Sequence, residues 1–265
     1  AASDVYKRQG VMFGVVPKVL WNKVYPEMND NLVPITLRSL VVETDGRVIL
    51  IDTGIGDKLD EKSMSYLFAF GGDGLVDGLA KCGYTPDDIT DVVHTHLHFD
   101  HCGGSTKFGP DGNIELTFPN AKYHVSSTQW EEATNPNVRE ADSFPPDNIL
   151  PMKELGVLNI IDKECELVKG VELRLFNGHT SGQIVPLIHA PNRRTIAYAA
   201  DVIPTAAHVP IVWNMSYDIR PLETMEEKER LLKEALERDY ILIFEHDYYT
   251  CLLYTSPSPR DRTRS

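Results

Sequence analysis

The sequence predicts an α/β fold in which two β-sheets are sandwiched between helical layers. Strand-sized apolar runs recur in both halves of the 265-residue chain, and each half also contains helical segments. A single large domain can take up this whole length without a second hydrophobic core. We therefore expect one α/β domain over residues 10–251.

The two ends of the chain differ in composition from the body. Residues 1–9 and 252–265 carry neither a helical nor a strand period, and the second segment is rich in Ser, Pro and Arg. Segments without a periodic apolar face cannot offset the entropy that is lost on ordering. We expect both ends to be disordered or foreign to the native protein.

Charge and hydropathy disfavour two classes of protein. The formal net charge is −13, and such a surface repels the phosphate backbone of a nucleic acid. No apolar run reaches the roughly 18 residues that span a bilayer, so no membrane partner is expected. The four cysteines show no CxxC spacing, which favours reduced thiols and a cytoplasmic location. We expect a small-molecule substrate as the partner, and the chain is also compatible with a homodimer.

The N-terminal part of the body is predicted to supply short strands and one Gly-rich turn. Residues 10–16 and 33–43 are predicted as strands, with a Pro-containing loop between them. Residues 47–52 form a buried strand after a Thr-Asp-Gly turn, so this strand closes a hairpin with the preceding one. The strand leads into residues 52–56, where glycines allow the backbone to approach another group closely.

The rest of the body alternates strands with helices. The clearest helix spans residues 224–238, because Met225, Leu232 and Leu236 fall on one side and Glu and Lys on the other. Two shorter helices are expected over residues 74–82 and 127–133. The remaining strands are expected over residues 91–95, 122–125, 165–168, 171–176, 184–189, 195–200 and 241–244.

A dense group of metal-ligand side chains follows the strand at residues 91–95. His96, His98, Asp100 and His101 lie within six residues, where the strand runs into a Gly-rich loop that can turn them toward one point. Three of the nine histidines of the chain are in this segment. This clustering indicates a metal site and is hard to explain as chance.

The segment HTHLHFDH, residues 94–101, resembles the HxHxDH signature of the metallo-β-lactamase superfamily. The strand end LIDTG at residues 50–54 is similar to the first motif of that family. His179, in GHTSGQ, resembles its third motif, Asp201 its bridging carboxylate and His246 its last histidine. The resemblance covers residues 10 to about 247 and implies an αββα fold, with two mixed sheets and a dinuclear site between them.

The resemblance also implies how the ligands divide. His96, His98 and His179 would hold the first metal ion, and Asp100, His101 and His246 the second. Asp201 would bridge the two, and Asp52 would orient a ligand. Imidazole and carboxylate ligands without a thiolate suit two Zn²⁺ ions, which is our expectation, and also Mn²⁺, Co²⁺ or Fe²⁺.

Within the superfamily, the chain is most similar to the quorum-quenching lactonases and the methyl parathion hydrolase group. This similarity implies hydrolysis of a lactone or related ester by a metal-bridging hydroxide, with Asp100 managing the proton. A phosphotriesterase or arylesterase is the alternative within hydrolases. Two other classes stay open: a mononuclear iron sulfur dioxygenase, which would use only the first three histidines, and a binding module without activity. Pro204 departs from the lactonases, which often carry Tyr three residues after the bridging Asp.

The other histidines receive separate interpretations. His208 lies seven residues after Asp201 in a Pro-bounded loop, and we predict that it contacts substrate. The residues predicted to be structural are His94, Cys102, His124 and His189. Aromatic or Pro-rich segments either wall the pocket or pack in the core: Trp21, Phe68, Phe70, residues 144–146 and residues 213–217.

Overall fold

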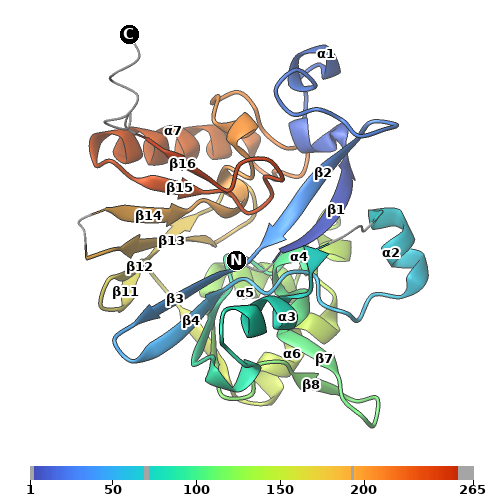
Figure 1. The fold of residues 1–265 in the computed structure, drawn as a ribbon, viewed down its shortest axis with the longest axis vertical. Helices are drawn as coiled ribbons and strands as arrows, with labels where there is room; N and C mark the ends of the chain where they lie inside the picture. The colour runs from blue at the N-terminus through green and yellow to red at the C-terminus, as the bar shows by residue number, and fades with distance from the viewer. Residues whose placement is uncertain (1–2, 69–71, 192–193, 256–265) are drawn as a thin grey trace.

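The structure is a computed structural model that describes residues 3–68, 72–191 and 194–255 (Figure 1). Two main sheets dominate it, one with strand order β10-β9-β6-β4-β3 and one with order β11-β12-β13-β14-β15-β16. A three-stranded sheet, β2-β1-β5, and the hairpin β7-β8 complete the described strands. Both main sheets are mixed, as predicted.

The five-stranded sheet carries the first half of the ligands. Strands β4, β6, β9 and β10 run parallel, and β3 joins β4 as the predicted antiparallel hairpin. The carboxyl ends of the parallel strands therefore meet at one edge, where ligands bind in α/β sheets. The strands of this sheet are β3 Leu40–Thr44, β4 Arg47–Ile51, β6 Asp91–Val93, β9 Lys122–Ser126 and β10 Leu158–Ile161.

The six-stranded sheet carries the remaining predicted ligands, in the segments that follow β12, β14 and β15. Its strands pair antiparallel except for β14 and β15, which are parallel and are connected through helix α7. The strands are β11 Cys165–Val168, β12 Val171–Phe176, β13 Gln183–His189, β14 Thr195–Tyr198, β15 Ile241–Ile243 and β16 Leu252–Tyr254.

Helices cover the outer faces of both sheets (Figure 1). Apolar side chains of α3, α5 and α6 pack on the five-stranded sheet, and those of α7 pack on the six-stranded sheet. A separate cluster that includes Ile51, Val93 and Ile184 fills the space between the sheets. The layers are thus helix, sheet, sheet and helix, which confirms the predicted αββα fold. The α-helices are α1 Lys18–Trp21, α2 Glu61–Leu67, α3 Leu75–Lys81, α4 Phe99–Cys102, α5 Ser127–Thr134, α6 Pro146–Glu154 and α7 Pro221–Glu237.

Two predicted strands near the N-terminus differ from the structure. Residues 10–16 do not form a strand but the 3-10 helix η1 Gly10–Phe13, and Gly14 follows it at φ +53°. Residues 33–43 divide into two strands of different sheets, β2 Leu32–Arg38 and β3. An apolar run identifies a strand but not its partner, so the change of sheet at Ser39 leaves no mark in the sequence.

The ends of the chain contain more structure than expected. Residues 3–9 form strand β1, Ser3–Gln9, which pairs antiparallel with β2 along its whole length, so they are not disordered. Backbone hydrogen bonds form this ladder and require no apolar period. Residues 252–254 form the edge strand β16, and the rest of the predicted C-terminal tail, residues 256–265, lies outside the described residues.

Helix α7 buries a face that only partly matches the predicted one. Leu232 packs against the core, as predicted, but Leu236 is 63% exposed. The inward face also carries Thr224, Lys228, Leu231 and Ala235. The Lys228 ammonium group is buried because it donates hydrogen bonds to the backbone carbonyl oxygens of residues 208, 210 and 213. In the sequence, a lysine is assigned to the polar face of a helix, so the pattern could not show that Lys228 lies on the buried face.

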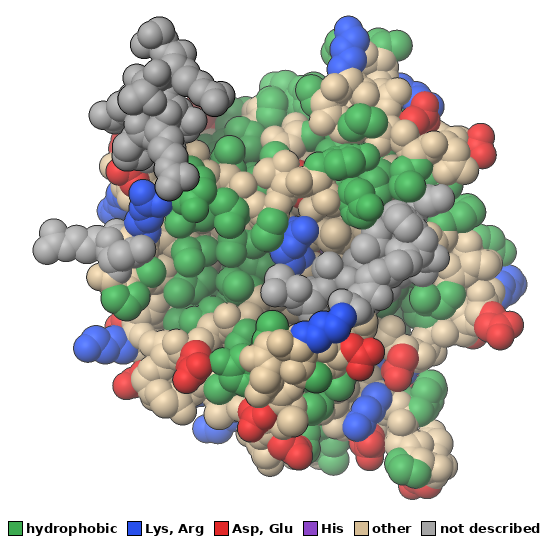
Figure 2. Space-filling model, viewed as in Figure 1, with side chains coloured by type: hydrophobic (Ala, Val, Ile, Leu, Met, Phe, Trp, Pro, Cys, Tyr) green, Lys and Arg blue, Asp and Glu red, His purple; other side chains and the backbone are tan. Residues whose placement is uncertain are grey.

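No helix in the described ranges is long and apolar enough to cross a membrane. Figure 2 shows basic and acidic side chains interspersed on one face of the molecule, without a continuous basic surface. This agrees with the acidic net charge of −13.

Candidate metal centre

The predicted ligands come together where the two sheets meet. His96 and His98 lie between the end of β6 and helix α4, Asp100 and His101 lie in α4 itself, and His179 lies in the turn from β12 to β13. Asp201 follows β14, in the 3-10 helix η5 Ala200–Val202, and His246 follows β15. All seven residues are buried. They form three overlapping groups whose ligand atoms lie within 4.8 Å of one another: His96, His98 and His179; His96, His101 and Asp201; and Asp100, His101 and His246.

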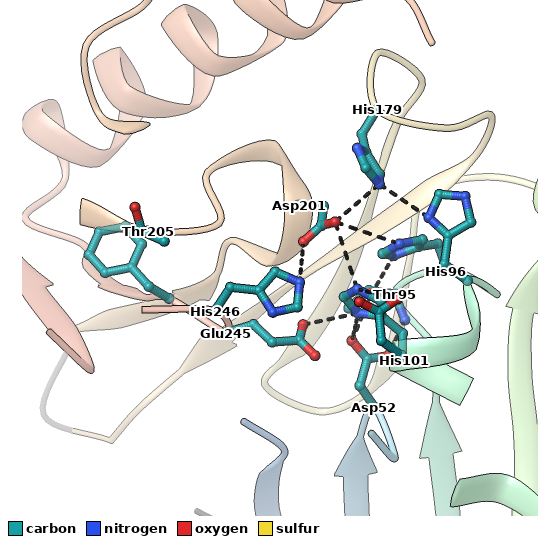
Figure 3. A network of polar contacts seen from close by, with 12 residues as sticks. Asp52, Thr95, His96, His101, His179, Asp201, Thr205, Glu245 and His246 are labelled. Atoms are coloured by element: carbon teal, nitrogen blue, oxygen red, sulfur yellow. Dashed lines mark hydrogen bonds and ion pairs between the residues drawn. The ribbon is translucent and has the colours of Figure 1, made fainter. Parts of the chain in front are cut away.

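Asp201 lies at the middle of the cluster (Figure 3). Its Oδ2 atom is 3.1 Å from His179 Nε2 and 3.7 Å from His101 Nε2, and its Oδ1 atom is 2.9 Å from His246 Nε2. Burial alone would raise the pKa of Asp201, but the imidazoles of His246, His179 and His101 hold it well below the usual value. The carboxylate therefore stays charged between two sets of nitrogen donors, which is the placement of a bridging ligand.

The cluster contains polar atoms that the protein itself leaves unsatisfied. Within the described part of the chain, His96 Nε2 and His101 Nε2 are buried and have no hydrogen-bond partner. Buried polar groups of proteins are almost always paired, so two orphaned nitrogens that face the same carboxylate indicate a missing electrophile. A divalent cation fits these nitrogen and carboxylate donors, and no thiolate lies among them.

The second ring nitrogen of each ligand histidine has its own acceptor on the side away from the centre. For the first set, His98 Nε2 is 3.2 Å from Glu140 Oε1, and His179 Nδ1 is 2.9 Å from Asp218 Oδ1. His96 Nδ1 is 3.0 Å from the hydroxyl of Thr95. These partners orient the rings so that His96 Nε2, His98 Nδ1 and His179 Nε2 face inward.

The second set is held in the same way. His246 Nδ1 lies 2.8 Å from the carbonyl oxygen of Thr36, and His101 Nδ1 lies 3.1 Å from Asp52 Oδ2. Asp52 also accepts hydrogen bonds from the backbone N–H and the hydroxyl of Thr95, each at 2.7 Å. The carboxylate of Asp52 thus positions both the His101 ring and the loop that carries His96, as the sequence indicated.

Burial and nearby charges shift the pKa values of the imidazoles in opposite directions. Burial lowers the pKa of His96 well below its usual value. Burial would also lower the pKa of His179, but Asp201 and Asp218 raise it to about 10. A bound cation would replace the protons that this negative site otherwise attracts, because metal ions bind the deprotonated ring nitrogen.

A cavity of about 360 Å³ opens onto the ligands. His98, Asp100, His179, Asp201 and His246 are among the residues that line it. The rest of the lining combines an apolar part with a smaller polar part, as small-molecule sites do. The apolar part is Val11, Met12, Ile35, Phe99, Met215 and Ile219, and the polar part is Arg139, Glu140, Ser143, Ser216 and Tyr217.

Comparison with known proteins agrees with this geometry. The family model described as "Metallo-beta-lactamase superfamily" matches residues 38–246. The chain belongs to the metallo-beta-lactamase superfamily.

Members of the superfamily with similar sequences include N-acyl homoserine lactonases. That of Bacillus thuringiensis is 26% identical over 242 residues, which are 84% of this chain and 88% of the relative. That of Agrobacterium fabrum, AttM, is 25% identical over 178 residues, 66% of this chain and 64% of the relative.

Solved structures of the superfamily match as well. A probable metal-dependent hydrolase from Staphylococcus aureus has a TM-score of 0.89 and 29% identity, with 96% of this chain and 90% of that chain covered. AidC, described as a dizinc quorum-quenching lactonase, has a TM-score of 0.77 and 21% identity, with 97% and 89% covered. The homologues and the structural neighbours are metallo-hydrolases, and this superfamily member is a metal-dependent hydrolase.

His208 does not lie where the sequence suggested. It is 1% exposed and is not among the residues that line the cavity. Its Nε2 donates to the carbonyl oxygen of Met12 at 2.6 Å, so Nδ1 accepts from the hydroxyl of Thr205 at 2.7 Å, and the ring stacks on Phe13. This geometry contradicts a direct contact with substrate. The ring instead fixes Met12, which does line the cavity.

The other structural assignments agree with the packing. Cys102 is buried and donates to the carbonyl oxygen of Leu97, and His94 Nε2 lies 2.9 Å from the hydroxyl of Ser105. His124 contacts Asp91 at 2.7 Å, far along the sheet from the metal ligands. His189 lies at 3.0 Å from Thr195 and 3.3 Å from Glu172 near the end of β13.

Of the aromatic and Pro-rich segments expected either to wall the pocket or to pack, some do each. From residues 213–217, Met215, Ser216 and Tyr217 line the cavity. Trp21 is buried in a separate apolar cluster, and Phe144 packs against the ring of His98 instead of facing the cavity. Phe70 lies outside the described residues.

Sequence reasoning missed three carboxylates that act on the ligands. Glu140 and Asp218 lie far in sequence from the histidines they contact, and a carboxylate in a loop carries no signal of such a role. Glu245 lies against His101 and directly precedes the ligand His246, so its position beside a motif residue was the one available clue.

Proposed function

We propose that this chain is a dinuclear metallo-hydrolase that opens a lactone or cleaves a related ester of a small molecule. The observation that carries the proposal is the pair of ligand groups, His96–His98–His179 and Asp100–His101–His246, with Asp201 between them. The lactonase relatives support the substrate class, because they match over most of the chain.

The chain offers each of two ions a set of donors. The first set is His96, His98 and His179, and the second is Asp100, His101 and His246, with Asp201 shared. Two ions bound there would supply Lewis-acid polarisation of the ester carbonyl and activation of water at neutral pH. Zinc is the proposed metal, because the donors are imidazole and carboxylate only.

Other residues of the chain bind and orient the substrate. The apolar side of the cavity, which includes Val11, Met12 and Ile35, would bury an acyl or alkyl chain. Asp100 lines the same cavity and is our candidate to carry a proton to the departing alkoxide. Arg139 and Tyr217 offer polar groups for the head of the substrate.

The second ligand set separates this proposal from a mononuclear iron dioxygenase. Such an enzyme needs only His96, His98 and His179. Asp100, His101 and His246 are nonetheless buried and lie within 4.8 Å of one another, and His101 Nε2 has no partner in the described chain. Three converging donors at that position have no role in a mononuclear enzyme.

A substrate panel tests the proposal directly. The zinc-reconstituted protein is assayed with N-acyl homoserine lactones of several chain lengths, simple lactones, aryl esters and phosphotriesters. We expect the highest kcat/KM for lactones and loss of activity on treatment with a chelator. A higher kcat/KM for phosphotriesters would reassign the substrate class, and no hydrolysis of any member would overturn the proposal.

A further inference from the structure

Glu245 is a buried carboxylate that the proposed mechanism does not use. It is 1% exposed and lies between the two sheets, directly before the ligand His246 (Figure 3). Its Oε2 atom is 3.1 Å from His101 Nδ1, the nitrogen that points away from the metal centre. The side chain therefore contacts a proposed ligand of the second ion from behind.

The protein offers this carboxylate few hydrogen-bond donors. Among the described residues, neither carboxylate oxygen of Glu245 has a hydrogen-bond partner. The Tyr198 hydroxyl lies nearby, but it donates its single proton to the carbonyl oxygen of Arg38 at 2.5 Å. The His101 N–H makes its hydrogen bond to Asp52. An ionised carboxylate that is buried without donors is costly, so its charge must be offset through the His101 ring, either by a proton or by an ion at the inward nitrogen.

His101 differs in this respect from the other ligand histidines. The outer nitrogens of His98 and His179 each face one carboxylate, and that of His246 faces a backbone carbonyl. Only His101, of these described ligands, faces two, Asp52 and Glu245, both at 3.1 Å. The excess negative charge is thus concentrated behind the ligands of the second ion.

We infer that Glu245 is the counter-charge of the second metal position and sets the affinity of that position through His101. The inference rests on the proposed dinuclear function. A carboxylate behind a ligating imidazole makes the inward nitrogen more basic and offsets the charge of the ion. Glu245 is a positioning residue, since it does not line the cavity and reaches the ion only through the ring.

The inference predicts different effects on the two forms of the protein. Removing the charge of Glu245 lowers the affinity of the second position for its ion, because only one of the two carboxylates behind His101, that of Asp52, keeps its charge. The stability of the metal-free form changes little, because the carboxylate of Glu245 has no hydrogen-bond partner to lose in the described chain. A purely structural carboxylate would instead stabilise both forms alike.

The test uses Glu245→Gln in the full chain, with Zn²⁺ alone as the probe. Stepwise Zn²⁺ binding to metal-free protein is measured by competition with a chelating indicator, and melting of both forms is measured by circular dichroism. We expect the affinity of the second ion to fall about 10- to 100-fold, the usual effect of losing such a partner, and that of the first to change less than about threefold. The metal-free variant should melt close to the wild-type temperature.

Two matched variants sharpen the result. Asp218→Asn removes the charge of the carboxylate behind His179 and should lower the affinity for the first ion instead of the second. Asp91→Asn removes a buried carboxylate at the opposite end of β6, and should lower the melting temperature of both forms without changing either affinity.

Each outcome decides between interpretations. Unchanged affinity for the second ion in Glu245→Gln, or a metal-free variant that melts several degrees lower or fails to fold, overturns the inference. If the wild-type protein itself binds only one Zn²⁺, the dinuclear proposal fails first. If it binds two and the variant matches it, only the role of Glu245 fails.

Discussion

Strand β6 carries a buried polar cluster at each end, and the two clusters differ in how their polar atoms are satisfied. At the amino end, the Asp91 carboxylate accepts hydrogen bonds from Arg47, from Thr90 at 2.7 Å and from His124 at 2.7 Å. His124 in turn accepts from the side chain of Asn159. Just beyond the carboxyl end, His96 Nε2 and His101 Nε2 have no partner in the described chain.

The contrast shows how a polar cluster that is complete differs from one that lacks a cation. Both ends combine buried imidazoles and carboxylates, so residue type and burial do not separate them. The amino-end cluster pairs its ionised and imidazole groups internally and is complete without an ion. The carboxyl-end cluster leaves nitrogens and the Glu245 carboxylate unpaired, and a cation is what completes it.

The largest expected effect comes from Asp201→Ala, which removes the donor that the two proposed ions would share. Several kcal/mol of charge stabilisation are lost with the ions, so kcat/KM should fall by about 10³-fold or more. Metal content after dialysis and kinetics on the best lactone measure it. The same analysis on Asp91→Asn should show full metal content. Loss of metal in that variant would contradict the claim that only the carboxyl-end cluster binds metal.

Arg47→Met should destabilise the fold through the complete cluster at Asp91 and leave the metal ligands of the incomplete cluster unchanged. Arg47 hydrogen-bonds the carboxylate of buried Asp91 through its Nε atom at 2.6 Å. Loss of charged hydrogen bonds of this kind costs about 2 kcal/mol of unfolding free energy. Urea denaturation measures the cost. Equal stability with the wild type would mean that this cluster contributes little to the fold.

The same cluster predicts part of the response to acid. Burial alone would raise the pKa of Asp91, but hydrogen bonds from His124 and Arg47 hold it well below the usual value. Its stabilising contribution is therefore complete above the unfolded-state pKa of about 3.9 and is lost as the pH falls below it. Stability measured against pH should be less steep below about pH 4 in Arg47→Met than in the wild type. Parallel curves would contradict this role of Asp91.

His208→Ala should have the smallest effect on turnover. The ring holds Met12 in the cavity wall and does not face the substrate, so we expect both ions to be retained and kcat/KM to fall only a few-fold. Paired kinetics and metal analysis measure this. A loss of about 10²-fold with full metal content would restore the direct role that the sequence suggested.

Sequence reasoning located the ligands but not the residues behind them. His96, His98, Asp100 and His101 are adjacent in the chain, so their clustering is visible before folding. The roles of Glu140 and Asp218 arise only when loops from distant segments meet, and no local pattern encodes such contacts. His208 shows the reverse error, because its place in a loop after Asp201 says nothing about which side of the wall the ring occupies.

The same limit applies to the fold. Strands such as β11 and β12 match their apolar runs, because period and turn residues are local properties. Strand β1 has no such period and forms because β2 offers it an antiparallel edge. The buried Lys228 of α7 is likewise determined by the carbonyl groups of a distant loop.

The central claim is that the incomplete cluster holds two metal ions, and metal stoichiometry tests it most directly. Metal-free protein is reconstituted with excess Zn²⁺, freed of unbound metal and measured by elemental analysis beside Asp201→Ala. We predict two equivalents per chain for the wild type and a loss of both in the variant. A reproducible single equivalent in the wild type, with Asp100, His101 and His246 replaceable without loss of metal, would contradict the account.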